Sequence, residues 1–153
     1  MRLVKFILLS LTFFVGPLHA QTVTAKDPTS IVTALQDMGY RAQLEVDEHG
    51  DPLIRSAAAG SRFSIYFYAC QENENCQDLL FIAWLATDNP PSFEAINSWN
   101  ANKLTGTTFI DDDGDAAIQL FIPGAIDLTE DRFQQIMRRW DQALGAFMDF
   151  VFD

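Results

Sequence analysis

The sequence predicts an α+β domain: an antiparallel sheet of three hairpins, with a short N-terminal helix, a middle helix and a long C-terminal helix packed on it. Residues 63–69 and 79–85 are apolar runs that alternate as strands. They are apolar on both faces, which is typical of central strands covered on both sides. The acidic turns at 47–51 and 111–115 each contain a glycine and separate two shorter apolar runs, which indicates two further hairpins. From Phe133 onward, apolar residues recur at three- and four-residue spacing, which predicts a helix of about 22 residues.

Local signals place the elements in the first half of the chain. Residues 21–26 are polar and are expected to be frayed. Asp27, followed by proline, is a helix N-cap with a first-turn proline, and Gly39 ends that short helix. Apolar and polar residues alternate over 42–46, and a weaker strand follows over 52–57, where the leading proline suits an edge or the start of a strand.

The second half is predicted in the same way. The middle helix starts at Asn89, which precedes a proline, or at Ser92. Strands 107–110 and 116–122 flank an Asp-Gly turn and form the third hairpin. Asp127, with a glutamate three residues later, is a capping box that begins the last helix.

The N-terminus has the pattern of a secretory signal peptide. Two basic residues precede an apolar run over 6–15, and a Gly-Pro break and the small Ala20 follow it. We expect cleavage after Ala20, which divides the chain into a signal peptide, 1–20, and one domain, 21–153. An uncleaved anchor is the alternative, but the run is shorter than the roughly 20 residues of a membrane span. The mature protein is therefore expected to be periplasmic or secreted, without stable membrane insertion.

The mature chain is strongly acidic. Removal of the leader leaves eight basic and 21 acidic residues, a formal net charge of −13. Such a surface repels phosphate backbones and anionic lipids, so nucleic acid is not an expected partner. Charged partners are expected to be basic, although acidity also serves solubility alone.

Two cysteines, Cys70 and Cys76, stand at the ends of a polar loop between the two central strands. In an exported chain they predict a disulfide, and five intervening residues suit the loop of a hairpin. A redox pair is the alternative, but the spacing is not C-x-x-C. A structural zinc site needs four ligands, and the mature chain offers these two cysteines and His49.

A family resemblance rests on three stretches: GYRAQLEVDEHGDPLIR, FSIYFYACQENENCQDLLFIAWL and INSWNANKLTGTTFIDDDGDAAIQLFI, followed by a long helix containing RRW. Together they resemble the YbjN domain family, described as bacterial sensory transduction regulators, over about residues 27–150. The resemblance implies a fold similar to type III secretion chaperones, in domains that self-associate and bind other proteins. It brings no catalytic residues. The commoner members are cytoplasmic, so a partner of this chain is expected in or crossing the cell envelope.

Two groups of residues are candidates for recognition. Asn97, Trp99 and Asn100 lie on the middle helix, either as a polar recognition spot beside an aromatic anchor or as structural residues. In the structural interpretation, which we favour, Trp99 packs on the sheet and the amides satisfy neighbouring backbone groups. Phe150 and Phe152 lie outside the main apolar stripe of the last helix. They either anchor a dimer or client, or wrap over the sheet edge.

No enzymatic site is predicted. His49 lies in an acidic turn, and the chain has no Gly-x-Ser-x-Gly elbow, phosphate loop or dinucleotide motif. The turn at 111–115 lacks the glycine and glutamate positions of an EF-hand, so a solvated hairpin turn is favoured over calcium. We expect no cofactor and no resident metal. The expected protein is an exported, non-enzymatic protein-binding module, a regulator or chaperone-like adaptor that binds an unidentified protein or a second copy. The alternative is a periplasmic sensor of a small molecule or cation.

Overall fold

The computed structural model describes residues 22–153, so the predicted signal peptide lies outside the described residues. Six strands form one antiparallel sheet in the order β2-β3-β4-β5-β7-β6. These strands are β2 (Ala42–Val46), β3 (Pro52–Ala58), β4 (Ser61–Tyr68), β5 (Asp78–Leu85), β6 (Thr107–Ile110) and β7 (Ala116–Ile122). The helices are α1 (Pro28–Asp37), α2 (Phe93–Asn102) and α3 (Glu130–Phe152). The predicted α+β class is confirmed.

The three predicted hairpins are present, and the two strongest apolar runs form the middle of the sheet. β2 pairs with β3, β4 with β5, and β6 with β7, all antiparallel. After β5 the chain passes through α2 and β6 before β7 returns to pair with β5. This route places β2 and β6 at the two edges of the sheet.

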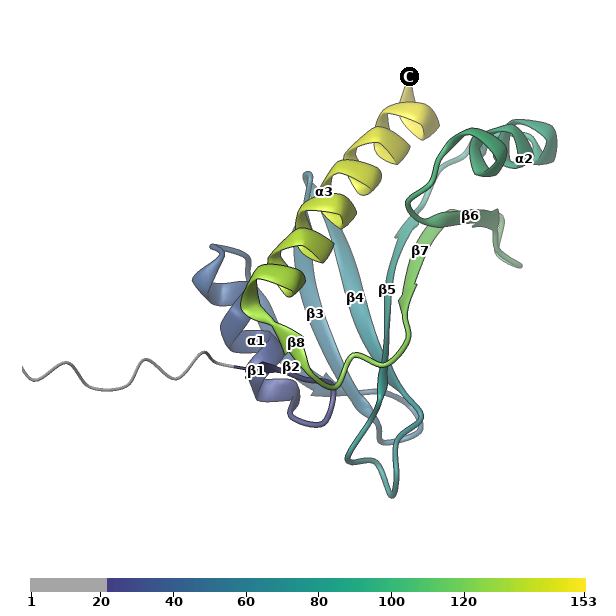
Figure 1. Ribbon diagram of the computed structural model, residues 1–153. Coiled ribbons are helices and arrows are strands. Elements are labelled where there is room, and N and C mark those ends of the chain that lie inside the picture. Colours follow the sequence, from purple (N-terminus) through teal and green to yellow (C-terminus); the bar gives the residue numbers. More distant parts are fainter. Residues whose placement is uncertain (1–21) are drawn as a thin grey trace, which may run out of the picture.

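The helices pack on one face of the sheet, as Figure 1 shows for α3, which crosses in front of the strands. The apolar stripe of α3 supplies Phe133, Trp140 and Phe147, which are fully buried. The ring centroid of Trp140 lies 5.5 Å from that of Phe63 on β4 and 5.8 Å from that of Phe81 on β5. The core therefore lies between α3 and the two central strands.

Within residues 22–153, no helix lies on the other face of the sheet, so the prediction that both faces are covered is wrong for the described part of the chain. Its side chains include Arg55, Arg62 and Tyr68, which are exposed, among apolar neighbours. Antiparallel sheets commonly leave one face in water. An apolar pattern on both faces does not distinguish a covered face from a half-open aromatic one.

The residues after the predicted signal peptide are ordered rather than frayed, from Thr22 onward. β1 (Thr22–Val23) pairs with β8 (Leu128–Thr129) in a second, two-stranded sheet. Val23 is buried, and the Ala25 N–H donates to the Ala125 carbonyl. This contact joins the N-terminus to the segment before α3.

The last helix begins later than predicted. Its N-cap is Thr129, whose Oγ1 accepts a hydrogen bond from the Arg132 N–H at 3.2 Å, rather than Asp127. Pairing with β1 holds Leu128 and Thr129 extended, so the helix cannot start before Glu130. The predicted N-cap Asp27 of α1 is confirmed, and of the two predicted starts of α2 the N-cap is Ser92 rather than Asn89.

Candidate functional site

The disulfide between Cys70 and Cys76 closes the loop between β4 and β5. The two Cα atoms lie 3.8 Å apart, and Cys76 is 1% exposed while the loop residues between the cysteines are exposed. Glu72, Asn73 and Asn75 all have positive φ, an uncommon conformation for residues other than glycine. The disulfide therefore closes a loop whose backbone conformation few other sequences would adopt.

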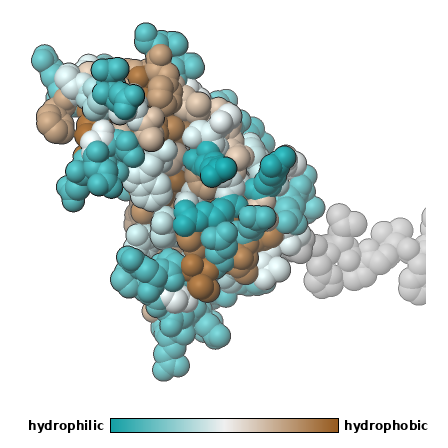
Figure 2. Space-filling model, turned by 180° about the vertical axis from the view of Figure 1, so that it is seen from behind, coloured by the Kyte–Doolittle hydropathy of each residue, from teal (hydrophilic) through white to brown (hydrophobic). Residues whose placement is uncertain are grey.

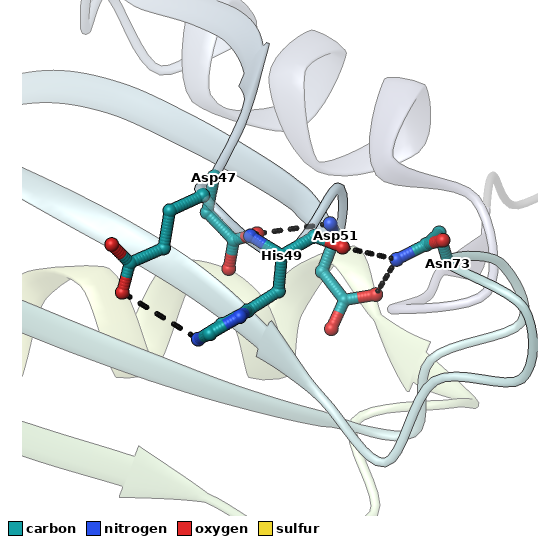
Figure 3. Close-up of polar contacts among 5 residues, drawn as sticks. Asp47, His49, Asp51 and Asn73 are labelled. Atoms are coloured by element: carbon teal, nitrogen blue, oxygen red, sulfur yellow. Dashed lines mark hydrogen bonds and ion pairs between the residues drawn. The ribbon is translucent and has the colours of Figure 1, made fainter.

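Asn73 connects this loop to the turn between β2 and β3 (Figure 3). Its Nδ2 donates to the His49 carbonyl at 3.0 Å and to Asp51 Oδ1 at 2.8 Å. Gly50 has φ +90°, and a Cβ there would lie 3.2 Å from Asn73 Nδ2. The positive φ thus favours glycine at this position, and a Cβ there would also crowd the amide of Asn73.

The two acidic turns share one hydrogen-bond pattern. Asp47 Oδ1 accepts from the N–H groups of His49 and Asp51, and Asp111 Oδ1 accepts from those of Asp113 and Asp115. These carboxylates act as turn residues that hold their own backbone. Within residues 22–153, no cluster of three metal-ligating side chains is placed to hold an ion.

Among the described residues, His49 does not form a catalytic arrangement with a nucleophilic side chain. Its side chain is 77% exposed, and its Nε2 lies 3.5 Å from Glu48 Oε1 in the same turn (Figure 3). An exposed imidazole beside a flexible glutamate does not hold a defined geometry. The turn therefore provides no constellation for catalysis.

The side-chain amide of Asn100 binds the backbone of β6. Its Nδ2 donates to the Thr108 carbonyl at 3.0 Å, and its Oδ1 accepts from the Thr108 N–H at 2.9 Å and from the Thr108 hydroxyl at 3.1 Å. Asn97 is exposed on the same helix. Of the two amides, Asn100 thus has the role of the structural interpretation.

Trp99 packs against the aromatic side chains of α3. It is 8% exposed, with ring centroids 5.3 Å from Phe147 and 5.0 Å from Phe150. Lys103 Nζ lies 5.1 Å above the ring. This cluster joins α2 to the C-terminal half of α3.

The two C-terminal phenylalanines have different environments. Phe150 is half-buried against Trp99, and its ring centroid lies 6.0 Å from that of Phe147. Phe152 is 55% exposed near the end of the chain. Phe150 therefore contributes to the packing of α2 on α3, and Phe152 alone of the pair is largely open to solvent.

An aromatic surface lies on the face of the sheet opposite α3. We define it by Tyr68, Trp84 and Phe121, which are 45%, 40% and 51% exposed. Tyr66 supports it with an edge-on contact to Trp84, at 6.4 Å between ring centroids. Figure 2 views the molecule from this side and shows pale and brown surface between hydrophilic groups.

An arginine-lined groove of about 840 Å³ continues this face toward β2. Arg41, Arg55 and Arg62 line it, although residues 22–153 contain only eight lysines and arginines. Arg55 is held by Ser64, whose Oγ lies 2.7 Å from Nη1, and by Glu45 at 3.5 Å. Trp84 stands at the groove as well. This is a concentration of positive charge on an otherwise acidic molecule.

Comparison with protein families gives a match over residues 27–153, to YbjN, "Putative bacterial sensory transduction regulator". The chain belongs to the YbjN family. The family description is that of a regulator and not of an enzyme. No match was found among the curated proteins.

A solved structure shares the YbjN fold. It is the crystal structure of YbjN, "a putative transcription regulator", from E. coli. The two chains are 14% identical, with a TM-score of 0.55, over 82% of this chain and 90% of that one. The likeness at this identity concerns the fold alone. In the described part of this YbjN domain, no helix has the length and apolar character to cross a membrane.

Sequence reasoning missed the aromatic surface and the groove. The pattern of the sequence predicts strands for the residues of the aromatic surface and the groove, but it places them on a face of the sheet that is covered. Tyr68 and Trp84 alternate with core residues, and only the absence of a helix on that side exposes them. The groove arises because Ala57 and Ser64, which are small, lie among longer side chains on neighbouring strands.

Proposed function

We propose that this YbjN protein is an exported, non-enzymatic regulator that acts by binding another protein in the cell envelope. The aromatic surface on the open face of the sheet carries the proposal. Exposed aromatic groups gathered on one face are costly to hydrate and are enriched at the energetic centres of protein interfaces. The regulator description of the family supports the same class of function.

The charge distribution supports a partner that combines apolar and acidic groups. The arginine-lined groove adjoins the aromatic surface through Trp84, which belongs to both. The rest of the molecule is strongly acidic and repels acidic partners, so this face offers the attractive contact. A partner with an acidic rim around an apolar centre fits this arrangement.

The disulfide and the predicted signal peptide support export. Disulfides persist in oxidising compartments and are rare in the cytosol. The disulfide Cys70–Cys76 joins a loop at the surface, where a reducing environment has access to it. An exported protein keeps this bond without further protection.

The test is a cross-linked pull-down from periplasmic extract with tagged wild-type protein and two variants. The double variant Tyr68→Asp with Phe121→Asp places charge on the aromatic surface. Phe93→Asp is the matched control, because Phe93 is 78% exposed on α2, outside that surface. We expect a stoichiometric partner that the wild type and the Phe93 variant recover and that the double variant loses. Equal recovery by all three proteins would contradict the proposal.

A second candidate, a sensor of a small molecule, has one observation in its favour. The arginine-lined groove has the volume of a ligand site, and its guanidinium groups suit a carboxylate or phosphate rather than a cation. Recovery of only the protein itself in the pull-down would favour this candidate over protein binding.

A further inference from the structure

The register of three strands sets two arginines on either side of a small residue in the arginine-lined groove. Ala57 on β3 pairs with Arg62 on β4. The β2–β3 register pairs Ala42 with Ser56, so Arg41, one residue earlier, comes opposite the same alanine from the other side. Neighbouring strands lie about 4.8 Å apart, which separates the Cα atoms of the two arginines by roughly 10 Å. The small side chain of Ala57 leaves the space between them open.

The third arginine of the groove is fixed in place. Arg55 pairs with Ser64, which is 3% exposed. Its Nη1 donates to Ser64 Oγ at 2.7 Å, and its Nε lies 3.5 Å from Glu45 Oε2. The charge of Arg55 is therefore partly balanced, and its side chain forms a defined wall beside the buried serine.

The other two arginines have no acidic partner. Within residues 22–153, neither Arg41 nor Arg62 forms an ion pair with a carboxylate. Acidic residues outnumber basic ones 21 to 10 in the full sequence, so partners for a surface arginine are in excess. The residues that line the groove carry three positive charges and one negative charge, a formal sum of +2. The groove thus keeps two guanidinium groups available to a ligand.

We propose that this groove binds a small organic dianion, whose negative charge is shared by Arg41 and Arg62 and whose body lies beside Trp84. Guanidinium groups bind carboxylates and phosphates through charge-assisted, often paired hydrogen bonds. The groove of about 840 Å³ falls within the roughly 300–1,000 Å³ of small-molecule sites. Dicarboxylates and phosphate esters share this chemistry. The inference rests on the second candidate function, the sensor, and does not depend on the protein partner.

The charge of the remaining surface limits the size of the ligand. A long polyanion would extend beyond the groove onto a strongly acidic surface, which repels it. A small dianion stays within reach of the three arginines and avoids that repulsion. The same distribution therefore favours a small ligand over a polymer with the same acidic groups.

The experiment is isothermal titration calorimetry of the purified protein at low ionic strength, with three probes that share a benzene ring. Phthalate is a dicarboxylate, phenyl phosphate is a dianion at about pH 8, and benzoate is a monoanion. We expect one site per chain, and a dissociation constant at least about tenfold lower for a dianion than for benzoate. Binding of phthalate alone identifies a dicarboxylate, and binding of phenyl phosphate alone identifies a phosphate ester.

Two double variants test the arginines. Arg41→Gln with Arg62→Gln removes the two charges without acidic partners. Arg132→Gln with Arg139→Gln is the matched control, because it removes two exposed charges from α3, on the other side of the sheet. We expect the dissociation constant of the dianion to rise at least about tenfold in the first variant and less than about twofold in the control. The proposal is overturned if the wild type saturates with neither dianion, or if the two double variants bind equally well.

The aromatic-surface variant separates this proposal from the proposed function. Tyr68→Asp with Phe121→Asp changes residues outside the groove, so it should bind the dianion as the wild type does. The titration contains no other protein, so its failure leaves the pull-down result intact. Failure to recover a partner likewise leaves the titration intact.

Collisional quenching tests the local charge without an organic ligand. Trp84 is 40% exposed, whereas Trp99 and Trp140 are 8% and 0% exposed, so dissolved ions quench mainly Trp84. We expect the ratio of iodide to caesium quenching constants to fall at least about twofold in the variant of Arg41 and Arg62, and to hold in the α3 control. An unchanged ratio in the first variant would contradict the proposed concentration of anions at this groove.

Discussion

At the scale of single residues, the side-chain amide of Asn100 makes the hydrogen bonds to the edge of β6 that a seventh strand would make. Its two polar atoms satisfy both outward-facing backbone groups of Thr108, which is 2% exposed. A buried backbone group without a partner is costly, so the contact matters for stability beyond its own hydrogen bonds. Asn97, one turn earlier on the same helix, is exposed and does not bind the backbone of β6.

Replacing Asn100 by alanine is therefore expected to lower the free energy of unfolding by about 1–3 kcal/mol. Asn97→Ala is the matched control and should change it by less than about 0.5 kcal/mol. Chemical denaturation followed by tryptophan fluorescence measures both. Equal losses for the two variants would mean that the Thr108 contact is not the source of the stability.

At the scale of elements, α3 carries one glycine in its interior. Gly145 lies on the helix where it passes the turn between β3 and β4, and a Cβ at Gly145 would lie 3.4 Å from the Cβ of Ala59. That separation is at the near limit of ordinary van der Waals contact. The glycine therefore weakens the helix without being required by a severe clash.

Gly145→Ala is expected to raise the free energy of unfolding by about 0.5–1 kcal/mol, because alanine has less backbone freedom to lose. Gly106→Ala is the contrasting variant and should destabilise. Gly106 has φ +81°, and a Cβ there would lie 2.9 Å from Ile118 Cδ1. Thermal unfolding of the two proteins should shift in opposite directions, and a fall in stability for both would show that Ala59 cannot accommodate the methyl group.

The elements that sequence reasoning found are those set by local signals. The caps Asp27 and Ser92 and the two acidic turns depend on residues a few positions apart, and these were placed correctly. The start of α3 was misplaced because it is decided by the pairing of Leu128 with Val23, which no local pattern contains. Tertiary contacts outweighed an adequate capping signal at Asp127.

At the scale of the whole molecule, the sequence indicated helices packed on an antiparallel sheet but not that one face of the sheet stays open. Core side chains such as Phe63 and Phe81 and surface side chains such as Tyr68 and Trp84 all belong to apolar strands. The difference arises from the three helices gathering on one side (Figure 1). Likewise, the groove depends on small residues that lie close together on the neighbouring strands β3 and β4, and their positions follow from the register of the sheet.

The intact mass of the protein isolated from the periplasm tests compartment and covalent state together. We expect a mass that lacks residues 1–20 and is lower by two hydrogen atoms, as one disulfide requires. Treatment with a thiol reagent should add mass only after reduction, at Cys70 and Cys76. A full-length mass, or labelling before reduction, would contradict the export and disulfide interpretation; a Cys70→Ser with Cys76→Ser variant controls for labelling at other sites.

The small sheet of β1 and β8 has a consequence for the order in which the molecule folds. It joins Thr22–Val23, near the beginning of the described chain, to Leu128–Thr129, just before the last helix. Loop closure over so long a stretch is slow, and contacts of this kind form late. During synthesis or translocation from the N-terminus, Val23 must wait unpaired until almost the whole chain has followed it. The native state is thus completed only when the segment just before the last helix has been made.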